Sequence, residues 1–157
     1  MTNSEHTMRV IGRREFVDLP ELNIHNIEAK IDTGAFTSAI HCEEIKEIED
    51  NGIRKLHFIL PEMYYPGNKT SKLTFETYSK KTIKNCFGEA EVRYVIRTKI
   101  HIGYNTIIAN FSLSDRKSMK YPILIGRKAI KGKFIVDVKQ THLNGIKLSL
   151  YLNQNSK

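Results

Sequence analysis

The stretch Ile31–Ile40 most constrains how this chain can fold, because an apolar strand ends there at a carboxylate and a sharp turn follows. Residues 27–31 alternate apolar and polar side chains, as a half-buried strand does, so Asp32 stands where regular pairing stops. Gly34 permits a backbone conformation that a residue with a Cβ resists. Residues 37–40 then resume as a second strand. The pattern predicts that Asp32 is held in a fixed place, as a functional carboxylate must be.

Asp-Thr-Gly also occurs in ordinary turns, because all three residues are common in turns of β proteins. A second element favours a functional interpretation: the apolar run Ile123–Ile125 ends at Gly126, and a short helical pattern follows. Two such elements in this order resemble the aspartic proteases of the retropepsin type. In that resemblance residues 32–35 carry the catalytic Asp and its loop, and the strand ending at Gly126 packs beneath the loop.

Length and charge limit the choice of function. A chain of 157 residues suits one domain with a single core. The formal net charge of +8 is scattered along the chain, so an acidic peptide, nucleic acid and simple solubility all fit it. No RNA-recognition or zinc-finger pattern is present, which makes nucleic-acid binding the weaker alternative.

Cysteine usage and hydropathy indicate the compartment. Cys42 and Cys86 are too few for a disulfide framework and lack CxxC spacing. The first seven residues have no apolar signal core, and no apolar run approaches the length that spans a membrane. We expect a soluble cytoplasmic protein that does not contact a membrane.

The periodicity predicts mostly β structure. We expect a disordered lead over 1–8, one domain over 9–153 and a tail over 154–157. The expected strands are 8–18 with a bulge at Gly12, 24–31, 36–48, 53–60, 73–79, 91–102, 106–113, 134–138 and 147–152. Residues 43–49 have helical propensity, but the Asn51-Gly52 turn favours a long hairpin. With one short helix over 127–130, the sum predicts a small closed or partly closed acid-protease barrel.

The loop 61–72 contains Tyr64 and Tyr65 among proline and glycine residues. Its length and aromatic content suit a lid over a site. Tyrosines that pack back onto the sheet suit the same pattern equally well.

A longer resemblance covers roughly residues 10–140. Residues 10–15, 30–41, 114–127 and 132–138 are similar to a bacterial family named as ATP-dependent zinc proteases, whose members often accompany ATP-grasp ligases that add glutamate to proteins. The chain itself has no HExxH motif, and His41 and Cys42 would point to opposite faces of a strand. It also has no GxxxxGK[ST] loop. We therefore expect no cofactor and no metal ligands, with zinc implied by the family name alone.

An aspartic mechanism needs two carboxylates that share a proton, so that one draws a proton from water and the other polarises the peptide carbonyl. The chain has one Asp-Thr-Gly, so a symmetric homodimer would bring two copies of Asp32 together. Asp137 or Asp115 is the alternative source, although Asp137 is more typical of a residue that ends its strand. The resemblance assigns catalysis to Asp32, with Thr33 bracing the two loops and Gly34 admitting water and substrate.

Substrate binding is predicted from charge. The candidate substrate-binding residues are Ala35, in the Asp32 loop, and the arginines Arg93, Arg97, Arg116 and Arg127. The arginines are candidates because a guanidinium group binds a carboxylate in bidentate fashion. Each arginine alone also suits a solvated strand face, whereas together they fit a glutamate-rich substrate. Thr37, Leu124 and Gly126 are expected to support the site. Phe36 stands where the viral enzymes usually carry an acidic residue, so their substrate contacts do not transfer.

Three functions follow. The first is a peptidase that hydrolyses peptide or isopeptide bonds, with an acidic substrate and a homodimer as its partners. The second keeps the fold as a non-catalytic peptide-binding module or a partner of an ATP-grasp ligase. The third takes the family name literally, as a zinc-dependent hydrolase.

Overall fold

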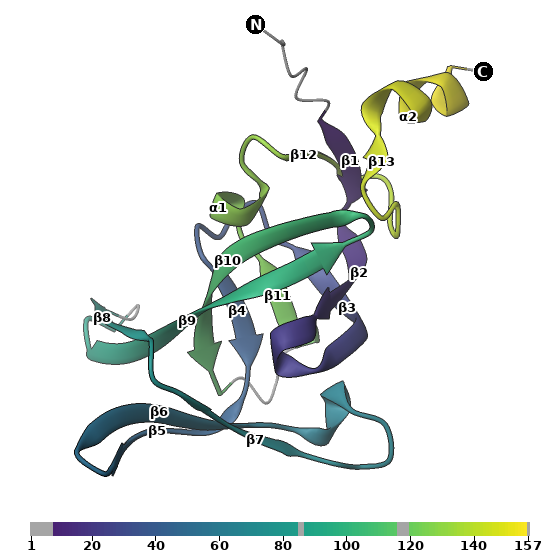
Figure 1. Ribbon diagram of the computed structural model, residues 1–157. Coiled ribbons are helices and arrows are strands. Elements are labelled where there is room, and N and C mark those ends of the chain that lie inside the picture. The colour runs from purple at the N-terminus through teal and green to yellow at the C-terminus, as the bar shows by residue number, and fades with distance from the viewer. Residues whose placement is uncertain (1–7, 85–86, 116–119, 157) are drawn as a thin grey trace, which may run out of the picture.

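The computed structural model describes residues 8–84, 87–115 and 120–156, and strands dominate it (Figure 1). The predicted lead over residues 1–7 lies outside the described residues. The strands are β1 (Arg9–Gly12), β2 (Arg14–Leu19), β3 (Ile24–Ile31), β4 (Ser38–His41), β5 (Glu43–Asp50), β6 (Ile53–Leu60), β7 (Ser71–Phe75), β8 (Ser79–Lys84), β9 (Ala90–Ile102), β10 (Asn105–Ser114), β11 (Ile123–Ile125), β12 (Phe134–Asp137) and β13 (Ile146–Lys147). The helical elements are the 3-10 turns η1 (Pro20–Leu22) and η2 (Glu62–Tyr64) and the helices α1 (Arg127–Ile130) and α2 (Leu148–Asn155).

Six of the described strands close into a barrel. They follow the order β10, β4, β11, β3, β2, β9, and β9 pairs back onto β10 from Asn105↔Ile102 to Leu113↔Tyr94. β8 extends the sheet beyond β9 and forms a hairpin with it. The predicted class, a small mostly β barrel, is confirmed. None of the helices in the described ranges has the length and hydropathy that crossing a membrane requires.

The core fills the barrel because inward positions alternate along its strands. In β9 the side chains of Ile96, Thr98, Ile100 and Ile102 are buried, and those between them are half-buried or exposed. Phe111 from β10, the cross-strand neighbour of Ile96, and Ile40 from β4 belong to the same core cluster as the three isoleucines of β9.

The strands β5, β6 and β7 form a separate sheet beside the barrel (Figure 1). Asn51 and Gly52 both have positive φ, at 51° and 77°, and join Asp50 to its partner Ile53 as a two-residue hairpin turn does. The predicted hairpin is confirmed, and the helical alternative over 43–49 is wrong.

The tyrosines of the loop after β6 pack back onto the barrel. The Tyr64 hydroxyl donates to the His41 carbonyl at 2.7 Å and is 3.3 Å from the Pro122 carbonyl. The Tyr65 hydroxyl donates to the Leu22 carbonyl at 2.8 Å. Burial raises the pKa of Tyr64. Of the two interpretations of this loop, packing onto the sheet is the one that the contacts support.

Two local predictions in the first part of the chain are wrong. Gly12 ends β1 and forms no bulge, and a Cβ at this position would lie 2.4 Å from the Gln140 carbonyl oxygen. Glycine is required there because two backbone segments meet closely. The strand expected over 73–79 is instead the end of β7 and the start of β8, with a bend between them.

The strand predicted over 147–152 is also wrong, because residues 148–152 form the first part of α2 and only Lys147 lies in a strand, β13. Their alternating leucines suggest a strand. After Leu148 donates to the Met8 carbonyl, however, the described residues offer this segment no neighbouring strand. A helix satisfies its own backbone groups in that setting. α2 is therefore a second short helix beyond the one expected.

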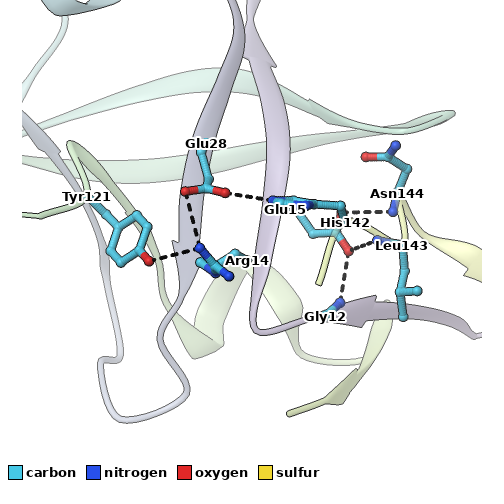
Figure 2. A network of polar contacts seen from close by, with 8 residues as sticks. All are labelled: Gly12, Arg14, Glu15, Glu28, Tyr121, His142, Leu143 and Asn144. Carbon is cyan, nitrogen blue, oxygen red and sulfur yellow. Dashed lines mark hydrogen bonds and ion pairs between the residues drawn. The ribbon is translucent and has the colours of Figure 1, made fainter. Parts of the chain in front are cut away.

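A buried carboxylate ties the strands that lead to Asp32 to the segment before β13 (Figure 2). Glu15 on β2 is fully buried and accepts the N–H groups of Gly12 at 2.9 Å, Leu143 at 2.7 Å and Asn144 at 2.8 Å. A carboxylate that accepts several N–H groups compensates well for the loss of water around it.

The same network reaches β3 and the approach to β11. Glu28 on β3 accepts His142 Nε2 at 2.6 Å and lies 3.7 Å from an Arg14 guanidinium nitrogen. Arg14 in turn donates to the Tyr121 hydroxyl at 3.3 Å (Figure 2). The network therefore braces β2 and β3 beside the strand that follows Tyr121.

We expect Glu15→Gln to lower the free energy of unfolding by about 2 kcal/mol, because the amide nitrogen faces N–H donors that the carboxylate accepted. Urea unfolding followed by circular dichroism measures the loss. Glu49→Gln, on an exposed strand position, is the matched control and should stay near the wild-type value. Equal stabilities of the two variants would contradict the role given to Glu15.

Candidate functional site

β11 lies between β3 and β4, although β3 and β4 are consecutive in the sequence. It pairs parallel with β3, at Ile125↔Ile31, and antiparallel with β4, at Leu124↔Ala39. The loop from Asp32 to Thr37 must therefore pass over the end of β11. The Asp32 N–H donates to the Ile125 carbonyl at 2.8 Å, which anchors the loop to that strand. The predicted packing of the Ile-Leu-Ile-Gly strand beneath the loop is confirmed.

Asp32 is half-buried as a residue, and its carboxylate is oriented by its own loop. Its Oδ1 accepts the Gly34 N–H at 3.1 Å, and its main-chain carbonyl accepts the Ala35 N–H at 3.2 Å. Gly34 does not have a positive φ, so the conformational reason given for it is wrong. A Cβ on Gly34 would lie 3.2 Å from Asp32 Oδ1, so glycine keeps the space beside the carboxylate clear.

Gly126 lets the loop and the end of β11 meet. A Cβ there would lie 2.7 Å from the Thr37 carbonyl carbon and 2.8 Å from the Phe36 carbonyl oxygen. The Gly126 N–H donates to the buried Ser38 hydroxyl at 3.0 Å. Sequence reasoning places Ser38 in a strand but not in the site, because a serine at a strand start becomes a candidate only once its partner is known.

The helix α1 closes the back of the loop. The N–H groups of Arg127 and Lys128 donate to the carbonyls of Ala35, at 2.8 Å, and Phe36, at 3.1 Å. The Arg127 side chain donates to the Thr33 carbonyl at 2.9 Å. Its guanidinium carbon lies 6.0 Å from the centre of the exposed Phe36 ring, as does the Lys128 ammonium. In this structure Arg127 holds the Asp32 loop, and its contact with substrate stays a prediction.

The other predicted site residues fall in different places. Arg93, Thr37 and Leu124 line one cavity of about 200 Å³. Arg97 lines a second pocket, of about 290 Å³, with Lys128 and Lys133. Arg116 lies outside the described residues.

The alternative second carboxylates lie away from Asp32 in the topology. Asp137 ends β12, which pairs with β1 in a sheet separate from the barrel sheet. It accepts the Tyr151 hydroxyl and the Lys139 N–H, and these bonds lower the pKa of Asp137. Asp115 is exposed beyond the end of β10. Over the described ranges, Asp32 has no hydrogen bond to a second carboxylate.

The donor side chains of the described residues do not gather into a metal site. Within residues 8–84, 87–115 and 120–156, no group of three or more His, Cys, Asp or Glu side chains is placed to hold a metal ion. Cys42 is a buried thiol whose pKa is raised by burial to about 12, which disfavours the thiolate that binds zinc.

A closed β-barrel whose Asp-Thr-Gly loop passes over an interposed Ile-Leu-Ile-Gly strand defines a retropepsin-like protein. The chain belongs to the RimB-like family, whose model is described as the retropepsin-like aspartic endopeptidase RimB and matches residues 10–146.

Relatives of known sequence carry a different name. The chain is 34% identical over 149 residues to a Shewanella pealeana protein named "Probable alpha-L-glutamate ligase", covering 92% of this chain and 32% of that protein. It is 31% identical over 129 residues to a Desulfotalea psychrophila protein of the same name, covering 82% of this chain and 28% of that protein. The chain thus spans about a third of the length of these relatives.

A solved structure supports the fold. The crystal structure of a Legionella pneumophila protein of unknown function is similar to this chain with a TM-score of 0.65 and 28% identity. The match covers 87% of this chain and 98% of that one.

We expect Gly126→Ala to displace the Asp32 loop and to lower the free energy of unfolding by about 1–3 kcal/mol, because the added Cβ overlaps backbone atoms. Urea unfolding and the amide chemical shifts of residues 32–38 measure the two effects. Ser38→Ala removes only a hydrogen bond and should cost about 1 kcal/mol. Wild-type stability and unchanged shifts in Gly126→Ala would refute the close packing of the loop.

Proposed function

We propose that this protein is an aspartic-type peptidase that hydrolyses peptide or isopeptide bonds in acidic substrates, with Asp32 from two copies of the chain as the catalytic pair. The observation that supports the proposal is the fixed placement of Asp32. Its main chain is bonded to β11, its carboxylate is oriented by Gly34, and the space next to Oδ1 is kept clear. A carboxylate held in this way is prepared for proton transfer.

The chemistry requires a second copy. Two carboxylates in contact share one proton, because like charges at short range cannot both ionise. The ionised carboxylate takes a proton from water as that water attacks the substrate carbonyl, and the protonated one donates to the carbonyl oxygen. Thr33 would brace the loops across the two-fold axis. The chain needs no cofactor for these steps.

Charge supports the choice of substrate. The chain carries a net charge of +8, and the two cavities beside the barrel contain Arg93 and Arg97. Guanidinium groups favour carboxylate side chains. The glutamate ligase name of the relatives belongs to proteins three times as long, and it fits a setting in which glutamate-containing chains are the substrate. We place this activity in the cytoplasm, beside a ligase of the ATP-grasp type.

A binding module is the second candidate. It is favoured by the single carboxylate at the site, since a monomer of this chain would hold peptide without the pair that cleaves it. A zinc hydrolase receives no support from the donor set of the described residues.

Asp32→Asn should abolish cleavage of acidic peptides and keep the fold, and a mixing experiment tests the pairing. Wild type and Asp32→Asn are combined in equal amounts, denatured and refolded together. If catalysis needs two Asp32 side chains, specific activity should fall to roughly one quarter, because mixed dimers are inactive. Peptide cleavage measured by mass spectrometry gives the activity, and sedimentation gives the oligomeric state.

Two other outcomes have clear meanings. Activity of one half in the mixture would show that each copy acts alone and would overturn the shared pair. A wild-type monomer that binds acidic peptide without cleaving it would favour the binding module.

A further inference from the structure

We infer that the cavity lined by Thr37, Arg93 and Ser112 binds one carboxylate side chain of the substrate and makes these residues determinants of specificity. The inference rests on the proposed function, because it assigns this cavity as a subsite of the same peptide-binding site. It does not depend on the cleavage step.

The cavity lies where the β8–β9 hairpin meets the strands around the Asp32 loop. Cross-strand neighbours lead from the hairpin to β11 in steps: Lys81↔Arg93 and Ser79↔Val95, then Val95↔Ser112, Ser112↔Ala39 and Ala39↔Leu124. Of these, Lys81, Val95, Ala39 and Leu124 also line the cavity. Thr37, the last residue of the Asp32 loop, completes it. A side chain held there therefore belongs to a peptide that passes the catalytic loop.

Two polar atoms of the lining residues are buried with unsatisfied hydrogen-bonding capacity. Ser112 is 8% exposed, and its Oγ has no hydrogen-bond partner among the described residues. The same holds for Arg93 Nε, which is buried although the rest of that side chain is half-buried. Burying such groups unpaired is unfavourable, so they indicate a place where a ligand's acceptor completes the bonds.

The arginine is already held in position at its other end. Arg93 Nη2 lies 3.5 Å from Glu91 Oε2 on the same strand, and both groups are partly exposed. The ion pair engages Nη2, whereas Nε is buried and has no hydrogen-bond partner among the described residues. A bound carboxylate oxygen would accept from Arg93 Nε and the Ser112 hydroxyl together.

Charge and size select the ligand. The described residues that line the cavity include Lys81 and Arg93 and no acidic residue, and Glu91 contacts the Nη2 end of Arg93 from outside this lining. An anion is therefore favoured over a cation. The volume of about 200 Å³ is smaller than typical pockets for drug-sized ligands or cofactors, so it suits one side chain rather than a nucleotide.

Binding to the Asp32→Asn protein tests the inference without cleavage. The probes are capped alanine hexapeptides that carry one glutamate at each position in turn, and their glutamine counterparts. Titration followed by the ¹⁵N–¹H signal of Arg93 Nε reports on the cavity directly. We expect a glutamate peptide to shift this signal and to bind at least tenfold more tightly than its glutamine counterpart.

Variants in the same background assign the effect. Arg93→Lys keeps the charge and loses the Nε–H geometry, and Ser112→Ala loses the hydroxyl. Each should reduce the glutamate preference about tenfold or more. Arg54→Gln removes an exposed positive charge from the β5–β6–β7 sheet and serves as the matched control, with its preference unchanged.

The outcomes separate this inference from the proposed function. Glutamate-dependent binding that requires Arg93, in a protein whose wild type cleaves nothing, would support the subsite and overturn the peptidase. Cleavage by the wild type with equal binding of glutamate and glutamine peptides would overturn the subsite alone. An Arg93 signal that no peptide moves would also overturn it.

Discussion

The insertion of β11 between β3 and β4 is the constraint on which the rest of the site depends. Two strands that are adjacent in the sequence are thereby kept apart, and the loop that joins them must pass over the end of β11. Such a crossing is possible only where side chains are small. Gly126 has no side chain at this crossing. The backbone N–H groups of residues 126–128 donate to the Ser38 hydroxyl and to the carbonyls of Ala35 and Phe36. These hydrogen bonds and the close approach at Gly126 fix the course of the Asp32 loop.

The barrel supports this crossing from two sides that differ in character. On one side, the carboxylates of Glu15 on β2 and Glu28 on β3 are buried or partly buried. Hydrogen bonds from N–H groups to these carboxylates hold the two strands in place. On the other side the β8–β9 hairpin meets the outer face of β10 with two polar atoms left unpaired. The carboxylates of the first side therefore already have hydrogen-bond donors within the protein. The second side has hydrogen-bonding capacity left over, which is the property expected where a ligand binds.

Sequence reasoning identified the elements whose signals are local. The Asp-Thr-Gly loop, the Ile-Leu-Ile-Gly strand and the Asn51-Gly52 hairpin each lie within a few residues, so their chemistry is visible in the order of residues. The bond between Gly126 and Ser38, the N–H donors to Glu15 and the cavity that Arg93 and Ser112 both line join distant segments, so only the folded structure reveals them. α2 was missed for the same reason, since its alternating leucines predict a strand that has no neighbour.

The symmetry of the proposed pair has a consequence for the substrate. If one Asp32 comes from each of two copies, each copy also brings its own Arg93 and Ser112 cavity, related by the same two-fold axis. A peptide lying across the axis would meet one carboxylate-binding cavity before the scissile bond and another after it. An acidic side chain on one side only would use half of this capacity. A symmetric pair of this kind would favour substrates with acidic residues on both sides of the cleaved bond.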